Sequence, residues 1–340
     1  MTISEIARKA GVSSATVSRV LNASGYVGAA TRQRVLEIIE QNEFVPNEMA
    51  RGLSKKDSNI IAVFVADIEN SFFSRAVRGI TDVADACGYN VVLFNTDENV
   101  EKEHRYLQTA VGLQCRGVII APVAEDDAET RKRLGRMRAQ GVPVVLLDRD
   151  IRGLELDGVF SEDASGARAA ADALIRSGHR RIAVIKGPDN TRPGRERMAG
   201  FRQALAESGL PLPPEYVRDG RFRLEASYEA ARALMQLPEP PTAIFAVNNL
   251  SSCGCLKYLA GRGLVIGRDV SLIGFDALDE LDDLGIRLSV VSRSFTQMGR
   301  RAMELLEQRI RQSAPARARR VLVPTQLLLR GSERLDGGIL

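Results

Sequence analysis

Residues 2–22, Thr2-Ile-Ser-Glu-Ile-Ala-Arg-Lys-Ala-Gly-Val-Ser-Ser-Ala-Thr-Val-Ser-Arg-Val-Leu-Asn22, predict two short helices joined by a tight turn. Thr2 and Glu5 have the spacing of a capping box, which begins a helix. Gly11 can adopt the left-handed conformation that ends a helix and turns the chain. Ser13 is a suitable N-cap for the second helix. The stretch therefore has the layout of a helix-turn-helix.

The two predicted helices place apolar residues toward each other and polar residues outward. The apolar residues at helical spacing are Ile3, Ile6 and Ala7 in the first segment and Val17, Val20 and Leu21 in the second. The outward residues of the second segment are Ser14, Ala15, Ser18, Arg19 and Asn22. Small side chains with one long cation suit a helix that enters the major groove of DNA. For this segment alone, an ordinary pair of surface helices is the alternative.

A series of further motifs follows along the chain. They are Val12–Asn22, Ser24–Val27, Thr31–Val35, Pro46–Leu53, Asn70–Phe73, Gly178–Ile182, Arg195–Phe201 and Asp269–Asp276. In order and spacing this series resembles the lac-repressor/galactose-repressor (LacI/GalR) family of bacterial transcription regulators, over essentially the whole chain. The chain departs from the family pattern at Gly28-Ala29-Ala30, at Ser71 and at Asn249, and it lacks a short basic lead before the first helix.

The resemblance implies a fold class and a domain organisation. Residues 1–45 would form a three-helix headpiece and residues 46–59 a hinge helix with its linker. Residues 60–331 would form two Rossmann-like parallel-sheet lobes of the periplasmic-binding-protein type. The chain would cross between the lobes three times, with residues 292–318 returning to the first lobe. The DNA-binding residues would be Ser13, Ser14, Ala15, Thr16, Ser18, Arg19, Asn22, Ala50, Arg51 and Leu53.

The apolar pattern from residue 60 onward independently predicts strands that alternate with helices. The predicted strands are Ile60–Ala66, Val91–Phe94, Gly117–Ala121, Val142–Leu147, Ile182–Ile185, Ala243–Val247 and Val270–Phe275. Helical periodicity fills the gaps, for example in Ser74–Ala86, Ala167–Arg176 and Glu196–Glu207. Continuous apolar strands that alternate with helices are typical of parallel sheets covered on both faces. The third helix of the headpiece is expected over residues 30–42.

Polar residues follow several of these strands, at the edge where parallel sheets bind ligands. They include Asp67, Asn70, Asn95, Thr96, Asp97, Asp148, Arg149, Asn248, Asn249 and Asp276. Carboxylates and amides make several hydrogen bonds in fixed planes, which suits sugar hydroxyls. The resemblance adds that Asp148, Arg197, Asn248 and Asp276 would line an effector pocket. The expected effector-binding set is Asn70, Phe72, Asp148, Arg149, Arg197, Phe222, Asn248, Asn249, Asp276 and Arg293.

Each of these residues also has a simpler structural interpretation. Asp and Asn at strand ends often form turns or helix N-caps, and Asn249 could cap the helix beside it. Phe72 and Phe222 could equally belong to the core. Arg293 stands where relatives often have Gln; with Arg149 and Arg197 it would favour an anionic effector, and the alternative is a surface arginine.

Composition narrows the class of protein. With 340 residues, 44% hydrophobic and 26% charged, the chain is expected to form two or three globular domains. The net charge is only +4, and residues 1–56 hold eight Arg and Lys against five Glu, so the DNA-binding prediction rests on the motif. The four cysteines lack CxxC spacing and the two histidines lie near none of them, which disfavours a metal site. We expect no cofactor.

We therefore expect a cytoplasmic homodimeric repressor that binds double-stranded DNA and is controlled by a sugar or sugar acid. The family resemblance implies that the operator is an inverted repeat with a central C-G step, at which Leu53 acts as a minor-groove wedge. No leucine heptad stands in residues 331–340, so no tetramer is expected, and no signal peptide or apolar run of roughly 18 residues suggests export or a membrane span. The alternatives are a Rossmann-like enzyme, disfavoured by the lack of a Gly-rich phosphate loop, and a ligand sensor without DNA binding.

Overall fold

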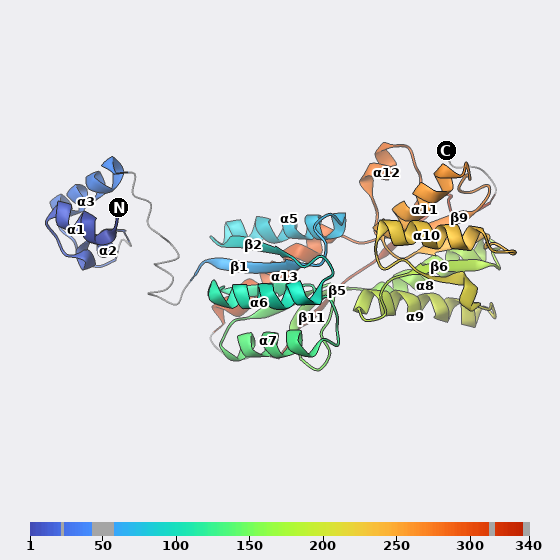
Figure 1. Cartoon of the computed structure of the whole chain (residues 1–340), viewed down its shortest axis with the longest axis horizontal. Coiled ribbons are helices and arrows are strands. Elements are labelled where there is room, and N and C mark those ends of the chain that lie inside the picture. The colour runs from blue at the N-terminus through green and yellow to red at the C-terminus, as the bar shows by residue number, and fades with distance from the viewer. Residues whose placement is uncertain (22–23, 43–57, 313–316, 336–340) are drawn as a thin grey trace. The chain divides into compact units, whose positions relative to one another are not determined.

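The computed structural model describes residues 1–21, 24–42, 58–312 and 317–335. The chain separates into two compact units, the headpiece (Met1–Ser58) and the receptor domain (Asn59–Leu340) (Figure 1). Four predicted DNA-binding residues lie outside the described residues, namely Asn22, Ala50, Arg51 and Leu53. In the described part of the chain, we find no helix with the length and apolar character needed to cross a membrane.

The headpiece contains three helices, α1 (Ile3–Ala10), α2 (Ser14–Leu21) and α3 (Ala29–Gln41). The predicted capping box is present, because the amide of Thr2 donates to the Glu5 carboxylate at 2.7 Å and the amide of Glu5 donates to Thr2 Oγ1 at 3.3 Å. Gly11 ends α1 with a φ of 68°. Ser13 Oγ accepts from the amide of Thr16 at 3.2 Å. These contacts confirm the helix-turn-helix.

A small core holds the three helices together. Its buried members are Ile6, Ala7, Ala10, Val17, Val20 and Val35. Ile3 was expected on the same face but is 39% exposed, because it lies in the first turn of α1, before the part that packs on the other helices. Gly28 caps α3 without a side-chain hydrogen bond, as expected of a cap that lacks a hydroxyl.

The receptor domain contains two six-stranded sheets, which define lobe 1 and lobe 2 (Figure 1). The sheet of lobe 1 has the order β11-β5-β4-β3-β1-β2 and is parallel throughout. Its strands are β1 (Ile60–Val65), β2 (Asn90–Asn95), β3 (Gly117–Ile120), β4 (Val144–Leu147), β5 (Asp157–Ser161) and β11 (Arg320–Val323).

The sheet of lobe 2 has the order β12-β10-β9-β8-β6-β7, in which only the edge pair β10–β12 is antiparallel. Its strands are β6 (Ile182–Lys186), β7 (Val217–Asp219), β8 (Ala243–Ala246), β9 (Ser271–Phe275), β10 (Ser289–Ser292) and β12 (Gln326–Leu328). The predicted class of two parallel-sheet lobes is confirmed, with this one antiparallel edge added.

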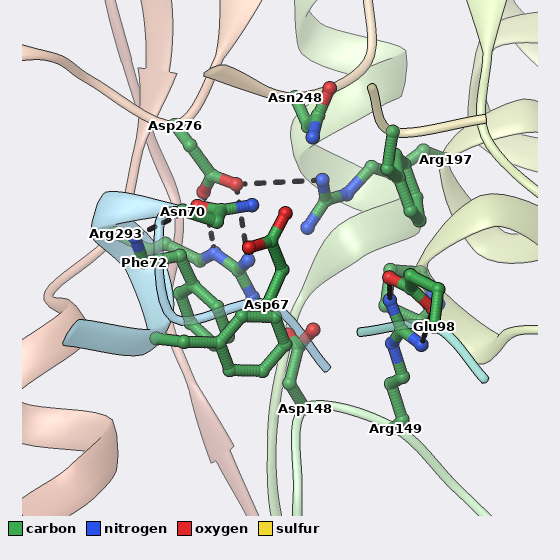
Figure 2. A pocket seen from close by; sticks show the side chains of 13 residues that line it. Asp67, Asn70, Phe72, Glu98, Asp148, Arg149, Arg197, Asn248, Asp276 and Arg293 are labelled. Atoms are coloured by element: carbon green, nitrogen blue, oxygen red, sulfur yellow. Dashed lines mark hydrogen bonds and ion pairs between the residues drawn. The ribbon is translucent and has the colours of Figure 1, made fainter. Parts of the chain in front are cut away.

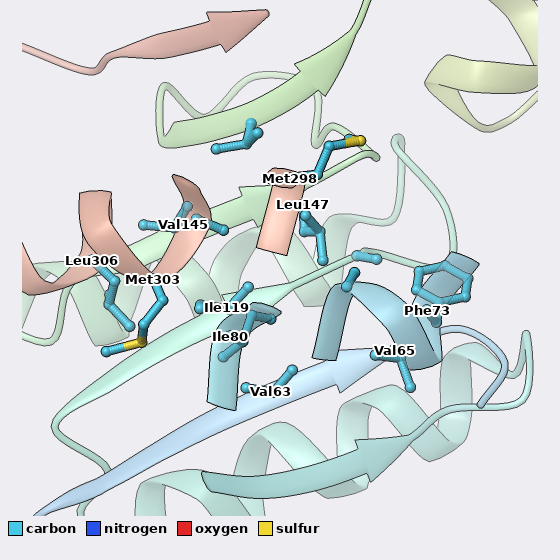
Figure 3. Close-up of a cluster of buried hydrophobic side chains, with 14 of the residues drawn as sticks. Val63, Val65, Phe73, Ile80, Ile119, Val145, Leu147, Met298, Met303 and Leu306 are labelled. Carbon is cyan, nitrogen blue, oxygen red and sulfur yellow. The ribbon is translucent and has the colours of Figure 1, made fainter. Parts of the chain in front are cut away.

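Helices cover both faces of each sheet. In lobe 1, α5 (Ser71–Ala86) and α13 (Phe295–Arg311) cover one face, and α6 (Val100–Gly112) and α7 (Ala128–Ala139) cover the other. Figure 3 shows the first of these layers, where Ile80 of α5 and Met303 of α13 pack over Val63 and Ile119. Because both faces of the sheet are covered, successive residues of β1 are all apolar, which confirms the predicted apolar strand.

Lobe 2 follows the same plan. The helices α8 (Asp163–Arg176) and α9 (Arg192–Glu207) cover one face, and α10 (Leu224–Met235) and α11 (Asn249–Gly261) cover the other. Two short helices complete the lobe, the 3-10 helix η1 (Pro214–Tyr216) and α12 (Asp279–Asp283). Both α5 and α9 begin earlier than their apolar periodicity predicted, because Asn70 and Thr191 act as their N-caps.

The chain crosses between the lobes three times, after β5, after β10 and after β11. The second crossing brings α13 onto the sheet of lobe 1, where it packs against α5. The prediction that residues 292–318 return to the first lobe is therefore confirmed for the described residues. The loops at these crossings place residues from both lobes close to one another, and the candidate ligand pocket lies there.

The buried residue His179 connects the C-terminal segment to lobe 2 through hydrogen bonds. It also makes the stability of the folded protein depend on pH. His179 Nε2 donates to the carbonyl of Glu333 at 3.1 Å, so Nδ1 accepts from the Thr242 hydroxyl at 2.9 Å. Burial lowers the pKa of His179. The unfolded chain therefore binds this proton more tightly than the folded chain, and stability is lost as the pH falls below about 6.5.

We expect this loss to be visible between pH 7.5 and pH 5.5 in chemical unfolding of the wild type, with a slope of at most about 1.4 kcal/mol per pH unit from this one group. His179→Gln should be less stable at pH 7.5 and should lose less stability on acidification. An identical pH dependence in both proteins would show that His179 does not carry this effect.

Candidate ligand pocket and DNA-binding helix

A small polar cavity lies between the two lobes, at the carboxyl ends of their strands (Figure 2). Its lining residues are Asp67, Asn70, Phe72, Phe73, Glu98, Asp148, Arg149, Pro193, Arg197, Phe222, Asn248, Asp276 and Arg293. Nine of the ten predicted effector-binding residues are among them, and Asn249 is not. This position is where open parallel sheets bind ligands.

Asp148 and Asp276 occupy equivalent positions in the two lobes. Asp148 follows β4 and its amide donates to the carbonyl of Val159; Asp276 follows β9 and its amide donates to the carbonyl of Val291, both at 2.8 Å. Both residues have left-handed backbones, with φ of 63° and 68°. Such conformations are costly for residues other than Gly and concentrate at functional sites. In each lobe the turn directs a buried carboxylate into the cavity (Figure 2).

Arg293 lies between these two carboxylates. It follows β10, and its Nε and Nη2 donate to the two oxygens of Asp276 at 2.7 and 3.2 Å. Its Nη1 donates to Asp148 Oδ1 and, at 2.7 Å, to Ser161 Oγ. The guanidinium also lies 4.4 Å from the centre of the Phe72 ring. Arg293 is only 7% exposed, so the interpretation as a surface arginine is wrong.

Arg197 is the second buried cation of the cavity. Its Nε donates to Asp163 at 2.7 Å and its Nη1 to the carbonyl of Val247 at 2.6 Å, with Asp276 3.6 Å away. The guanidinium lies 3.7 Å from the centre of the Phe275 ring. Nη2 is buried and has no hydrogen-bond partner within the described residues. Because an unpaired buried donor is costly, this nitrogen is the clearest point at which a ligand could bind.

Arg149, the third cation, is held by Glu98. Its two terminal nitrogens donate to the two carboxylate oxygens at 2.7 and 2.5 Å, a bidentate pair. Burial by itself lowers the pKa of Arg149, but the Glu98 carboxylate outweighs it and the pKa is raised. Arg293 likewise lowers the pKa of Asp148 against the opposing effect of burial. All three arginines of the cavity are thus paired with carboxylates.

The asparagines have roles that differ from one another. Asn248 is the N-cap of α11, accepting from the amide of Ser251 at 2.9 Å, and it lines the cavity. Asn249 was the suggested cap, and that suggestion is wrong because it is the first residue inside the helix. Its side chain instead reaches lobe 1, where Nδ2 donates to Asn70 Oδ1 and to Ser71 Oγ, both at 2.9 Å. Asn249 therefore connects the lobes.

For Phe72 and Phe222 both proposed interpretations hold. Each lines the cavity and each also belongs to a hydrophobic core, that of lobe 1 for Phe72 and that of lobe 2 for Phe222. Phe72 makes an edge contact with Phe295, with ring centres 5.3 Å apart. Phe222 has a left-handed backbone with a φ of 55°. The cavity therefore has apolar walls that belong to the cores of the two lobes.

Among the strand-end residues, Asn95 and Asp97 have structural roles. Asn95 accepts from the amide of Ile68 at 3.1 Å, and Asp97 pairs with Lys102 and Arg223. Asp67 lines the cavity while it forms a turn with the amide of Glu69 and an ion pair with Arg223. Glu98 and Pro193 line the cavity but were not predicted. Glu98 follows a predicted strand end and could have been found by the same rule.

The described part of α2 presents the face expected of a recognition helix. Ser13, Ser14, Ala15 and Arg19 are exposed, and Thr16 and Ser18 are half-buried. Val17 and Val20 are buried on the opposite side. A further exposed group, which the sequence did not single out, is Tyr26, 93% exposed in the loop that follows α2. An aromatic residue this exposed is available to a partner of the headpiece.

Comparisons with known proteins identify the families that these two parts of the chain resemble. Residues 2–47 match the model of bacterial regulatory proteins of the lacI family, and residues 171–333 match the periplasmic binding protein-like domain. The chain is 35% identical to catabolite control protein A of Priestia megaterium over 90% of its length and 91% of the relative's. It is 33% identical to the ribose operon repressor of Halalkalibacterium halodurans, covering 99% of this chain and 98% of that one.

A solved structure shows that the similarity extends to the three-dimensional fold. The lac repressor dimer bound to operator and the anti-inducer ONPF is similar with a TM-score of 0.83 and 25% identity, over 98% of this chain and 99% of that one. The relatives compared are transcription regulators rather than enzymes. The chain therefore belongs to the lacI family of bacterial regulatory proteins, DNA-binding transcription regulators that carry an effector-binding domain.

Proposed function

We propose that this protein is a repressor that binds an inverted-repeat operator as a dimer and is controlled by a small sugar in the cavity between its lobes. The observation that carries the proposal is the unpartnered, buried Nη2 of Arg197, which lies in a cavity walled by Phe72 and Phe222. A buried donor with no partner, beside carboxylates and an amide, is what a hydroxyl-bearing ligand would complete.

For DNA binding, we propose that α2 enters the major groove and that Ser14, Ala15 and Arg19 contact base edges. A two-fold dimer then matches a two-fold site, with the recognition helices about 34 Å apart. Leu53, outside the described residues, is proposed as a wedge at the central step of the operator, where unstacking costs a few kcal/mol that wider contact offsets. The lac repressor dimer bound to operator supports this arrangement by similarity.

The DNA contact can be tested by Arg19→Ala. If Arg19 makes a bidentate contact with guanine, operator binding should weaken by about 1–3 kcal/mol, while binding to random DNA should change much less. Arg34→Ala is the matched control, since Arg34 is an exposed arginine of α3 and its loss removes the same charge. Fluorescence anisotropy at one fixed salt concentration gives both affinities. An equal loss of affinity for operator and for random DNA would show that Arg19 contacts only phosphates.

For the effector, the ion pairs of the cavity favour a neutral sugar over the sugar acid that its arginines first suggested. Four lining carboxylates, Asp67, Glu98, Asp148 and Asp276, stand against three arginines. Each of these arginines is already paired with a carboxylate. A carboxylate ligand would therefore enter a site with no surplus positive charge. The similarity to a ribose operon repressor supports a sugar.

The effector can be identified by thermal-shift screening with neutral sugars, sugar acids, sugar phosphates and nucleobases. A ligand that binds the folded state raises apparent stability by mass action. A ligand found in this way should change operator affinity by about 1–3 kcal/mol, and the operator should change its affinity by the same factor. Shifts from nucleobases alone would refute the sugar, and a ligand without effect on DNA binding would refute the control of DNA binding through this site.

A further inference from the structure

The two lobes contact each other at several places beside the crossings of the chain. On one side Arg223 of lobe 2 pairs with Asp67 and Asp97 of lobe 1 at 2.7 and 3.0 Å. On another side Arg75 of α5 pairs with Asp279 of α12 at 2.8 Å. These ion pairs hold the two lobes closed on each other.

One of these contacts is a backbone hydrogen bond between the lobes. The amide of Glu125, which lies between β3 and α7 of lobe 1, donates to the carbonyl of Asn190 in lobe 2 at 2.9 Å. Asn190 lies just before α9. This bond exists only while the lobes are closed, so exchange of the Glu125 amide with solvent measures their opening.

At the base of the cavity, closure places two buried carboxylates toward each other. Asp148 belongs to lobe 1 and Asp276 to lobe 2, and both are 4% exposed. Without a cation between them, two buried like charges would repel and favour separation of the lobes. Arg293 bonds both, with Ser161 Oγ as a third acceptor and the Phe72 ring against its face. Its charge is held firmly, because these carboxylates raise the pKa of Arg293 although burial itself lowers it.

We propose that Arg293 takes the place of a ligand at the base of the cavity, bridging Asp148 and Asp276 and so keeping the two lobes closed without an effector. The inference rests on the proposed function, in which this cavity is the effector site. In this proposal the effector binds to lobes that are already closed. Effector binding then does not need to bring the lobes together, and the ion pairs of Arg293 set how easily they separate.

The test is hydrogen–deuterium exchange of the Glu125 amide in the effector-free full-length protein. In the wild type this amide should be protected. In Arg293→Ala it should exchange roughly tenfold faster or more, because Asp148 loses its paired cation and Asp276 keeps only Arg197, 3.6 Å away. Guanidinium chloride at about 20 mM, far below denaturing concentrations, should restore protection in this variant by filling the vacated site, and should have no effect on the wild type.

Arg309→Ala is the matched control. Arg309 forms a bidentate pair with Asp157 at 2.7 and 2.8 Å, which is somewhat more exposed than the pairs of Arg293 and lies within lobe 1 alone. Its loss should lower stability without changing exchange at Glu125. Arg293→Lys keeps one charge and should give intermediate exchange, which provides a result if Arg293→Ala does not fold.

Two outcomes would overturn the proposal. The Glu125 amide could exchange freely in the wild type, which would mean that the lobes are open without effector. Alternatively, it could exchange at the same rate in the wild type and in the Arg293 variants. Neither outcome bears on the proposed function, which operator binding by the same preparations tests separately.

Discussion

Replacing Arg197 by methionine is expected to lower the free energy of unfolding of the receptor domain by about 3–5 kcal/mol. Arg197 is the cation paired with Asp163, whose side chain is fully buried at 0% exposure. Methionine keeps much of the apolar volume against Phe275 but removes the charge, so the Asp163 carboxylate stays buried without a counter-ion. Most of the expected loss in the free energy of unfolding comes from leaving a buried charge without a partner, and less of it comes from the lost contact.

The double variant Asp163→Asn/Arg197→Met tests this cause. Removing the carboxylate charge as well should recover a large part of the stability, since the two residues are coupled. Urea unfolding of the wild type, both single variants and the double variant provides the four values needed. A single-variant loss below about 1 kcal/mol, or a double variant as unstable as Arg197→Met, would show that this pair does not hold the cavity together.

Replacing Gly299 by alanine is expected to cost about 1–3 kcal/mol, or more, because two helices approach too closely for a methyl group. Gly299 of α13 lies against the backbone of α5, and a Cβ there would overlap with the carbonyl oxygen of Ala76. Gly79 of α5 makes the reciprocal approach to Thr296 of α13. This helix pair covers one face of lobe 1, so relief of the clash would also move α13 on the sheet (Figure 3).

Gly135→Ala is the control for this prediction. Gly135 lies in the middle of α7, and a Cβ there would meet only Leu154 at an ordinary 3.9 Å. In that position alanine should stabilise the protein by about 0.5–1 kcal/mol, because glycine is the poorer helix former. Thermal unfolding should therefore shift in opposite directions for the two variants. Equal shifts would contradict the close approach of α5 and α13.

The sequence was sufficient for the elements whose signals are local. The capping box at Thr2, the glycine turn at Gly11 and the long apolar strands such as β1 were all predicted and are present. Strands β5 and β10 are among the strands that were not predicted, because Asp or Ser stands at their ends and neither has a continuous apolar run. Their burial comes from neighbouring strands in the sheet, which no local pattern reveals.

For the cavity, the strand-end rule and the family resemblance together pointed to most of the lining residues but not to their partners. It could not predict that Arg293 would lie between Asp148 and Asp276, because these three residues are far apart in the chain and meet only when both lobes fold. The same holds for Asn249, whose contact with Asn70 joins positions 179 residues apart. The sequence indicated three arginines near the cavity. It could not show that each of them forms an ion pair with a carboxylate of the protein.

The central claim, sequence-specific DNA binding by a dimer of this chain, is tested most directly by selection. The full-length protein is incubated with a pool of random duplexes, and the bound DNA is sequenced after several rounds. We predict enrichment of an inverted repeat whose half-sites lie about one helical turn apart, ~34 Å, with a C-G step at its centre. Enrichment of no sequence, or of a single half-site without its symmetric partner, would contradict the account.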